Sequence, residues 1–396
     1  AAKYRWPAEW NVILHLKERN LEEQALGRIN ALLEKEETGM PAPTGIRMLW
    51  LKSALILRGG DAESSIKLAD ETLRRLAEET QVDAQTKADL GSKINLTKGR
   101  AQFALKDRDS ANETFKRLRT EYPDSDETAF SYLVEANHHA ADNRLDEAQR
   151  SLLRLADQHE NSPYAPVALY EASIHLERRG LDKFLKEGID LLERLTKDYP
   201  DNRLVFYARQ RQANLLRRRN EFGPALELCE DLLSIERFRT HSARHSVMLI
   251  RADCILALAR EDRQKLLEAS EAYAELKRMA DKPMSFRSEA AYKQGVALRR
   301  MGRTKEAEKV YFRDVELALL AELQKRREVV EERASSGRYW LARSLLDFGE
   351  MLELGDRATQ AKVVYRKILA HGLPGSKLAL SRINALEGLE YTEEAP

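Results

Sequence analysis

Cysteine is scarce in this chain, and proline and glycine are few. Two cysteines, Cys229 and Cys254, cannot make a disulfide framework, and they lack the Cys-x-x-Cys spacing of zinc or redox motifs. We expect Cys229 to be a buried small apolar side chain, and a bridge to Cys254 stays open as the alternative. With 18 glycines, 11 prolines and 33% charged residues, the composition indicates a charge-rich helical protein rather than a disordered one.

Long apolar runs and an excess of one charge sign are also absent. No run approaches the roughly 18 apolar residues of a membrane-spanning helix, so we expect no membrane span. Lysine and arginine number 66 against 65 acidic residues. This balance argues against nucleic-acid or membrane binding by the whole molecule and leaves a local charged patch open.

Recognisable catalytic motifs are absent as well. The chain has no Gly-x-Ser-x-Gly elbow, no Walker loop and no His-Glu-x-x-His helix, so we expect no enzyme activity, no cofactor and no small-molecule substrate. His241 and His245 lie one helical turn apart, but no acidic residue or cysteine accompanies them on that turn. We therefore expect no metal site.

What the chain does contain is a recurring helical unit, in which a small residue is followed four positions later by a bulky one. Successive units are 37, 40, 37, 44, 38 and 54 residues apart, so the repeat is irregular. Stacked units form an extended surface rather than a catalytic pocket, because each unit buries its apolar face only against its neighbours. The pairs are Ala111/Phe115, Ala148/Leu152, Gly188/Leu192, Ala225/Cys229, Ala269/Tyr273, Ala307/Tyr311 and Ala361/Tyr365.

Each unit is predicted to be two helices joined by a short polar turn. A second small residue often lies twelve positions before the first, as with Gly99 before Ala111, and this pattern lets two antiparallel helices cross closely. Residues 110–113, Ser-Ala-Asn-Glu, have the form of a capping box that begins the second helix. Residues 122–125, Tyr-Pro-Asp-Ser, stop that helix and supply a cap for the next one.

These features resemble the tetratricopeptide repeat, whose unit has a small residue in each of its two helices, an aromatic residue four positions after the second, and a proline at the end. The unit with Gly99, Ala111, Phe115 and Pro123 is the most similar, and the resemblance covers residues 90 to 390. It implies an all-α, right-handed superhelical solenoid of about nine antiparallel helix pairs. The Tyr-Pro-Asp-Ser phrase looks like those of bacterial envelope members, such as the assembly lipoprotein of the outer-membrane insertion machinery and the periplasmic partner of the Tol-Pal system. The resemblance therefore implies a periplasmic or cell-envelope location, with the cytoplasm as the alternative.

Arginine is concentrated in the first helices of the sixth and seventh units. Residues 203–220 contain six arginines and residues 237–252 contain four, and neither segment contains an acidic residue. The resemblance places the first helices on the concave side of the stack, where these arginines would form one basic wall. The alternative is structural, because cations at the C-terminal end of a helix favour the helix dipole. The residues predicted to bind a partner are Tyr207, Gln210, Arg211, Asn214, Arg217, Arg218, Arg251, Tyr292 and Arg299.

The repeat pattern also predicts domains and interruptions. We expect divergent repeats in residues 1–90, core repeats in 91–303 and C-terminal repeats in 304–396. Residues 38–45 contain two prolines and two glycines and are predicted to form a loop. Nothing from 304 to 333 breaks a helix, so we predict one extended helix that ends in a turn at residues 335–337, Ser-Ser-Gly. That helix is either solvated and held by ion pairs or an arm that meets a partner.

We therefore predict a non-enzymatic scaffold that binds an acidic protein or peptide segment on its concave face, as part of a bacterial envelope complex. Two other functions stay open: a nucleic-acid-binding helical repeat that uses the same arginines on phosphates, and a docking domain of a larger enzyme. The chain begins at Ala1 without a methionine, and a cleaved signal peptide or a preceding domain would each explain that start.

Overall fold

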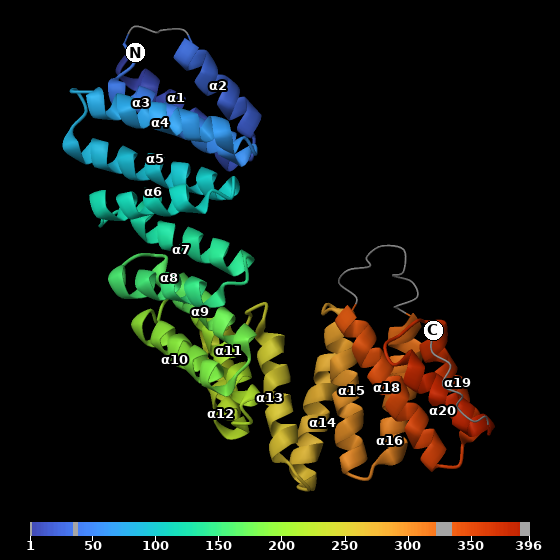
Figure 1. Cartoon of the computed structure of the whole chain (residues 1–396). Coiled ribbons are helices and arrows are strands. Elements are labelled where there is room, and N and C mark those ends of the chain that lie inside the picture. The colour runs from blue at the N-terminus through green and yellow to red at the C-terminus, as the bar shows by residue number, and fades with distance from the viewer. Residues whose placement is uncertain (1, 35–38, 322–334, 389–396) are drawn as a thin grey trace. The chain divides into compact units, whose positions relative to one another are not determined.

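The protein is built from consecutive helices, described by a computed structural model over residues 2–34, 39–321 and 335–388 (Figure 1). Within these ranges the regular secondary structure is helical throughout, which confirms the predicted all-α class. No helix in this part of the chain is both long and apolar enough to cross a membrane. The helices form two compact units, residues 1–195 and 196–396. The three-part division predicted from the sequence stays a prediction.

Unit 1 contains five antiparallel helix pairs. In each pair we call the first helix the A helix and the second the B helix. The A helices are α1 (Ala2–Glu18), α3 (Ala42–Arg58), α5 (Ala84–Ala104), α7 (Asp126–Ala141) and α9 (Ala165–Arg179). The B helices are α2 (Glu22–Glu34), α4 (Ala62–Glu78), α6 (Arg108–Glu121), α8 (Leu145–Gln158) and α10 (Asp182–Asp198).

Unit 2 continues with four pairs and a final single helix. The A helices are α11 (Val205–Arg218), α13 (Arg244–Leu258), α15 (Met284–Arg300) and α18 (Ser335–Leu354). The B helices are α12 (Phe222–Ser234), α14 (Arg263–Lys277), α16 (Thr304–Lys309) with its π-helical continuation η2 (Val310–Leu319), and α19 (Ala358–Ala370). A 3₁₀ turn, η1 (Glu236–Phe238), precedes α13, and α20 (Ser376–Glu387) packs on α19. The described residues thus form nine helix pairs, as predicted.

The small residue of an A helix receives an aromatic ring from its B helix. Phe115 of α6 lies so close to Gly99 of α5 that a Cβ added at Gly99 would be 2.2 Å from the ring. The Phe115 side chain is fully buried, so the ring has no solvent to move into. Only glycine leaves room for this approach, which explains the recurring small residue. The same contact occurs at Gly295/Tyr311 and Gly349/Tyr365, at 2.2 and 2.3 Å.

Side-chain caps set where the helices begin. The carboxylate of Asp107 accepts a hydrogen bond from the backbone N–H of Ser110 at 3.2 Å, so Asp107 caps α6. The predicted capping box at residues 110–113 is therefore wrong, because the cap lies three residues earlier and these residues are already helical. The Oγ of Ser125 accepts from the N–H of Thr128 at 3.1 Å, which confirms that the segment after Pro123 caps the next helix.

Two predicted interruptions are shorter than expected. Helix α3 begins at Ala42, so residues 42–45 of the predicted loop are helical; Pro43 lies in the first turn, where its missing N–H costs nothing. Residues 335–337 form the first turn of α18 rather than a separate turn, and a Cβ at Gly337 would lie 3.1 Å from Cε of Met284. The predicted extended helix is present to residue 321. Its remainder, to residue 333, lies outside the described residues.

Candidate protein-binding surface on the A helices of unit 2

Six of the residues predicted to bind a partner lie along one side of α11. They recur at intervals of three or four residues, which places them on a common face of the helix. Ala208, Gln212 and Ala213 occupy the buried side, whereas Tyr207 is 36% exposed. The structure therefore brings together Tyr207, Gln210, Arg211, Asn214, Arg217 and Arg218.

Arg217 links α11 to the next A helix. Its Nη2 donates to the side-chain oxygen of Asn214 at 2.9 Å, and its Nη1 lies 3.6 Å from Oδ2 of Asp253 on α13. The amide of Asn214 thus orients a guanidinium of its own helix. This contact gives Asn214 a structural role beside the predicted role in partner binding.

Asp253 of α13 is contacted by side chains from three other helices, α11, α14 and α15. Its carboxylate accepts hydrogen bonds from the hydroxyl of Tyr273 at 2.7 Å and from Nζ of Lys293 on α15 at 2.7 and 2.8 Å. The Asp253 side chain is only 12% exposed, so these partners replace most of its water. Burial, followed by the nearby Asp253 charge, raises the pKa of the Tyr273 hydroxyl, which keeps this group a hydrogen-bond donor.

Arg299 repeats the same arrangement between α15 and α18. Its Nη1 donates to Oδ2 of Asp347 at 3.1 Å, and its Nη2 donates to Oε2 of Glu350 at 3.3 Å. Burial raises the pKa of Asp347 although the guanidinium of Arg299 acts in the opposite direction. The contact therefore joins two A helices through a carboxylate that is largely removed from water.

An aromatic cluster lies beside these ion pairs. The rings of Tyr292 on α15 and Trp340 on α18 have centroids 5.4 Å apart. Nη2 of Arg343 donates to the Tyr292 hydroxyl at 3.1 Å, and Nζ of Lys293 lies 5.5 Å from the centroid of the Trp340 ring. The predicted residue Tyr292 is thus part of a mixed aromatic and cationic surface.

We call the set Arg217, Asp253, Lys293, Arg299 and Asp347 the ion-pair ladder. It connects all four A helices of unit 2, because each cation bonds to a carboxylate of a neighbouring A helix. The positive charges of Arg217 and Arg299 are therefore balanced within the fold. Residues 203–220 contain six arginines and no acidic residue, and Arg219 at the end of α11 forms an ion pair with Glu221.

Arg251 lies apart from the other predicted residues. Its Nη2 donates to Glu268 of α14 at 2.7 Å, and its Nε donates to Glu230 of α12 at 3.3 Å. Both carboxylates belong to B helices, so Arg251 points away from the ion-pair ladder on its own helix. The sequence analysis placed Arg251 in the basic wall because residues 237–252 contain no acidic residue, but its partners come from other helices.

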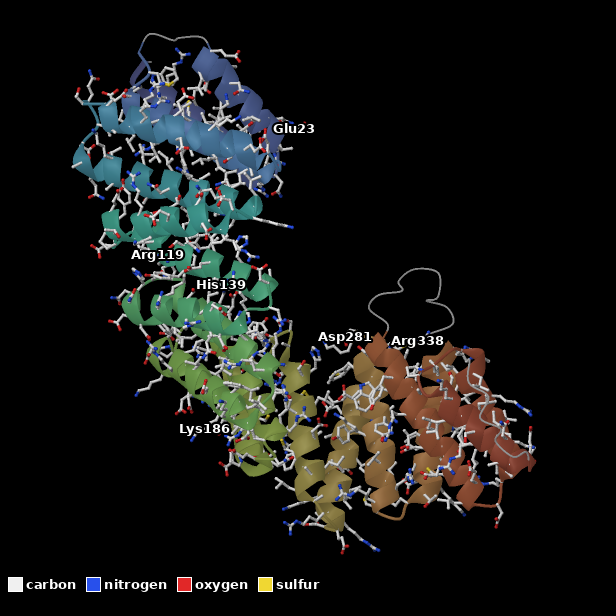
Figure 2. All side chains as sticks on the ribbon, in the orientation of Figure 1. Glu23, Arg119, His139, Lys186, Asp281 and Arg338 are labelled. Carbon is white, nitrogen blue, oxygen red and sulfur yellow. The ribbon has the colours of Figure 1, made fainter. Side chains whose placement is uncertain are left out.

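Unit 1 uses similar contacts between its helices. Nζ of Lys93 on α5 lies 3.3 Å from Glu127 on α7, which joins two successive A helices. Figure 2 labels Arg119 on α6 and His139 on α7; both have nitrogens near the Glu135 carboxylate, at 2.9 and 3.9 Å. Ion pairs between neighbouring helices are therefore a general feature of the stack rather than a peculiarity of unit 2.

The sequence analysis identified two of the five residues of the ion-pair ladder, Arg217 and Arg299. Asp253, Lys293 and Asp347 were not predicted, because charge was counted within each helix and not compared between helices. A usable signal exists, since Lys293 and Asp347 each lie two positions before the small residue of their A helix, Gly295 and Gly349. The opposite charges at this position in these two successive A helices indicate a possible pair.

The cysteines and histidines carry structural contacts. Cys229 and Cys254 are both buried and free, so the open alternative of a bridge is not realised. Burial raises the pKa of Cys229 to about 12 and that of Cys254 to about 11. The ring of His241 stacks on Phe206 with centroids 3.7 Å apart. Within the described ranges no cluster of three or more His, Cys, Asp or Glu residues has the geometry of a metal site.

One segment of the chain matches a known repeat family. The sequence profile of the tetratricopeptide repeat matches residues 96–125, which span the second half of α5, its turn and all of α6. This is the unit that contains Gly99, Ala111, Phe115 and Pro123. No curated protein matches the chain in sequence.

Several solved structures are similar in fold. A tetratricopeptide repeat protein from Parabacteroides merdae is 13% identical, with a TM-score of 0.39 over 65% of this chain and 98% of that chain. The apo form of the quorum sensor NprR from B. thuringiensis is 13% identical, with a TM-score of 0.40 over 81% of this chain and 96% of that chain. A chain of the Naa15/Naa10 structure bound to HypK-THB is 16% identical, with a TM-score of 0.41 over 96% of this chain and 55% of that chain. At sequence identities and TM-scores this low, the similarity to these structures gives no information about a binding partner.

Proposed function

We propose that this chain is a non-enzymatic scaffold of tetratricopeptide type, and that it binds a segment of a partner protein along the A helices of unit 2. The observation that carries the proposal is the ion-pair ladder. It holds α11, α13, α15 and α18 in fixed positions, and a binding surface made of several helices needs such support to be preorganised. Stacked repeats of this kind supply long surfaces rather than enclosed reaction sites.

The chemistry of the surface favours an acidic segment. Arg211 and Arg218 lie on the acid-free helix α11, and guanidinium groups can grip carboxylates with two parallel hydrogen bonds. The half-exposed ring of Tyr207 and the ring of Tyr292 supply apolar contact area. The amide of Gln210 adds a group that can bond a partner's backbone.

The remaining predicted residues are assigned a supporting role. Arg217, Asn214 and Arg299 hold the A helices to one another, so we propose that they position the surface rather than supply its main contacts. We place Arg251 outside the proposed surface, because its two partners belong to B helices.

We further propose that the chain works in a bacterial envelope complex. The support is the resemblance of its Tyr-Pro-Asp-Ser turn, residues 122–125, to those of envelope repeat proteins. Fractionation of cells that express the native gene product tests the location. Recovery in the periplasmic or membrane fraction is expected, and recovery with cytoplasmic markers would contradict this part of the proposal.

A pull-down from nuclease-treated extract tests the binding surface. The affinity-tagged chain is compared with a double variant, Arg211→Glu with Arg218→Glu, and with a control double variant, Arg263→Glu with Lys265→Glu. The control makes the same change in charge in the exposed first turn of B helix α14, where carboxylates are favoured by the helix dipole. The wild type and the control are expected to recover the same partner, and the α11 variant at least about tenfold less.

Two results would overturn the proposal. Equal recovery of the partner by the α11 variant would show that binding occurs elsewhere. Tight binding of unrelated nucleic acids that weakens steeply with salt, with no protein recovered, would favour the nucleic-acid alternative.

A further inference from the structure

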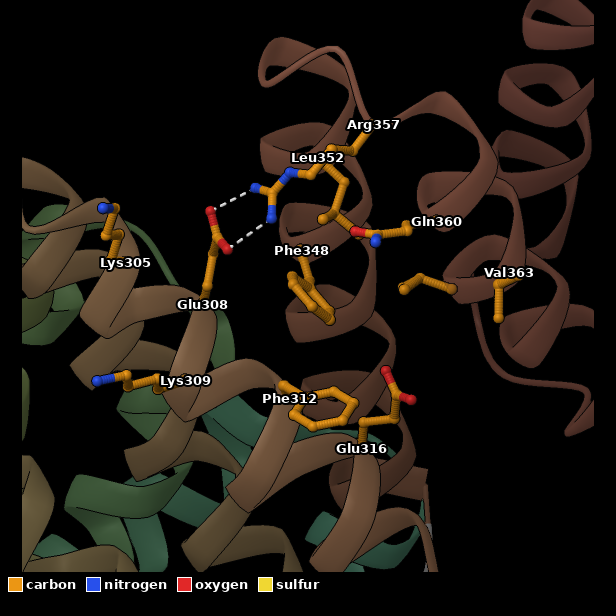
Figure 3. A pocket seen from close by; sticks show the side chains of 11 residues that line it. Lys305, Glu308, Lys309, Phe312, Glu316, Phe348, Leu352, Arg357, Gln360 and Val363 are labelled. Carbon is orange, nitrogen blue, oxygen red and sulfur yellow. Dashed lines mark hydrogen bonds and ion pairs between the residues drawn. The ribbon is translucent and has the colours of Figure 1, made fainter.

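A groove lies between two B helices of unit 2, on residues that the proposed function does not use (Figure 3). Its volume is about 610 Å³, within the usual range for binding sites in proteins. One wall is formed by α16 and η2, the other wall by α19, and the floor by α18. The groove is therefore built by the last two helix pairs of the stack.

Five apolar side chains line the groove, and two of them are open to water. Phe348 and Leu352 of α18 form the floor, and Val364 adds to the wall on α19. Phe312 is 44% exposed and Val363 is 49% exposed, one on each wall. Side chains of this size are left open to solvent at a cost of roughly 25 cal/mol per Å² of apolar area. A partner that covered them would recover that free energy.

The π-helical backbone of η2 shapes one wall. Val310, Val315 and Leu320 recur at the five-residue interval of a π-helix, and all three pack into the core of unit 2. Phe312 and Glu316, between these anchors, point into the groove (Figure 3). π-Helical segments are rare and occur often at functional sites, so this backbone irregularity is a second sign of a binding role.

The charges around the groove are unbalanced. Glu308 accepts two hydrogen bonds from Arg357, at 2.6 and 2.9 Å, and Glu316 forms an ion pair with Lys367 of α19. Both carboxylates of this wall are therefore neutralised by cations across the groove. Lys305 and Lys309 also line the wall, and neither has a hydrogen bond or ion pair within the described part of the chain. Both lysines are exposed, and in Figure 3 their ammonium groups point away from the floor, so they lie at the outer rim of this wall.

We propose that this groove binds an amphipathic helix of a partner protein, with apolar side chains on the floor and carboxylates beside Lys305 and Lys309. A helix fits because the site is a trough between two helices over a third, which is the arrangement of helix-in-groove recognition. The wall from Lys305 to Glu316 spans eleven residue steps, or roughly 16 Å, so about three turns of partner helix are covered. The unpaired lysines select an acidic flank on that helix.

A synthetic peptide tests this proposal on the full chain. The probe is a fluorescein-labelled 14-residue helix with leucines three and four residues apart on one face and glutamates along one flank, and binding is followed by fluorescence anisotropy. Saturable binding is expected. Val363→Glu places a charge on the groove wall and is expected to weaken binding at least about tenfold. Leu378→Glu, at a residue of α20 that is 51% exposed and outside the groove, is the control and is expected to bind as the wild type does.

A charge exchange makes the test specific. The double variant Lys305→Glu with Lys309→Glu is expected to bind the acidic peptide more weakly than the wild type does. It is expected to bind a matched peptide, with lysines in place of the glutamates, more tightly. Absence of saturable binding, equal binding of the two peptides to the wild type, or unchanged binding by the Val363→Glu variant would each overturn the proposal.

Two further measurements distinguish the proposed partner helix from two alternative occupants of the groove. If sedimentation showed a dimer that Val363→Glu converts to a monomer, the groove would hold a second copy of the chain, and the proposal would be wrong. Residues 389–396 contain Leu389, Tyr391 and three glutamates and lie outside the described residues. A chain ending at Gly388 that binds the peptide tenfold more tightly would show that this segment occupies the groove, which would also overturn the proposal.

Discussion

Replacing Gly99 by alanine is expected to destabilise unit 1, although alanine is the better helix former. Gly99 lies inside α5, where an exchange for alanine ordinarily stabilises a helix by about 1 kcal/mol. Here the added Cβ would lie 2.2 Å from Cε1 and 2.6 Å from Cδ1 of Phe115. Ordinary carbon contacts are near 3.5 to 4 Å, so the methyl group would overlap the ring by more than 1 Å.

The ring of Phe115 cannot move aside cheaply. It is fully buried, and the ring of Phe103 lies 5.6 Å from it between centroids. Overpacking of a filled core costs about 1 to 3 kcal/mol, and an overlap of this size belongs at the upper end of that range. After subtracting the gain of about 1 kcal/mol in helix propensity, the net loss for Gly99→Ala is about 2 kcal/mol.

Hydrogen exchange of the α5 and α6 amides measures this loss locally, which suits a stacked protein whose unfolding need not be two-state. Gly27→Ala in α2 is the matched control, because nothing lies within 4 Å of its Cβ position, and it is expected to stabilise by about 0.5 to 1 kcal/mol. Combining Gly99→Ala with Phe115→Ala should remove the overlap, so that alanine at residue 99 becomes stabilising. A stabilising Gly99→Ala in the wild-type background would refute the packing argument.

Three further predictions concern buried or partly buried polar groups. Asp253→Ala should destabilise unit 2 by roughly 1 to 3 kcal/mol, because two cations and a buried hydroxyl lose their common acceptor; an unchanged urea midpoint would contradict this. Burial raises the pKa of Glu171, so its contribution to stability is lost as pH rises through that raised pKa, and Glu171→Gln should raise the melting temperature at pH 7.5 but have little effect near pH 4. Cys229 and Cys254, with pKa values of about 12 and about 11, should react with iodoacetamide at pH 8 only after denaturation; rapid labelling of the folded chain would show that the thiols are not buried as described.

The sequence predicts the fold well because one packing pattern recurs in it. A small residue on one helix and a ring on the next, as at Gly99 and Phe115, determine how each pair crosses, and each pair then buries its apolar face on its neighbour. Boundaries were predicted less well. Proline is tolerated in the first turn of a helix, so Pro43 lies in α3 instead of extending the loop before it.

The candidate surface was only partly predictable, because its charges are paired between helices. Residues on a single helix, such as Tyr207 and Arg218, follow from helical spacing alone. Arg217 and Arg251 both looked like members of a basic wall, yet one bonds to an A helix and the other to two B helices. This difference depends on how helices that are far apart in the sequence pack against one another. The distribution of charge along the chain gives no information on that packing.

Photo-crosslinking at Tyr207 tests the central claim most directly. A benzoylphenylalanine at this half-exposed position of α11 should crosslink, in cells, to one protein within an acidic segment. The same group at Leu258, which is 37% exposed on α13, serves as a reference for random encounters, because Leu258 lies at the end of its helix and outside the predicted set. We expect a crosslinked partner at Tyr207 whose yield falls when Arg211 and Arg218 are replaced by glutamate. Crosslinks to nucleic acid, or equal yields at Tyr207 and Leu258, would contradict the assignment of a protein-binding surface to these A helices.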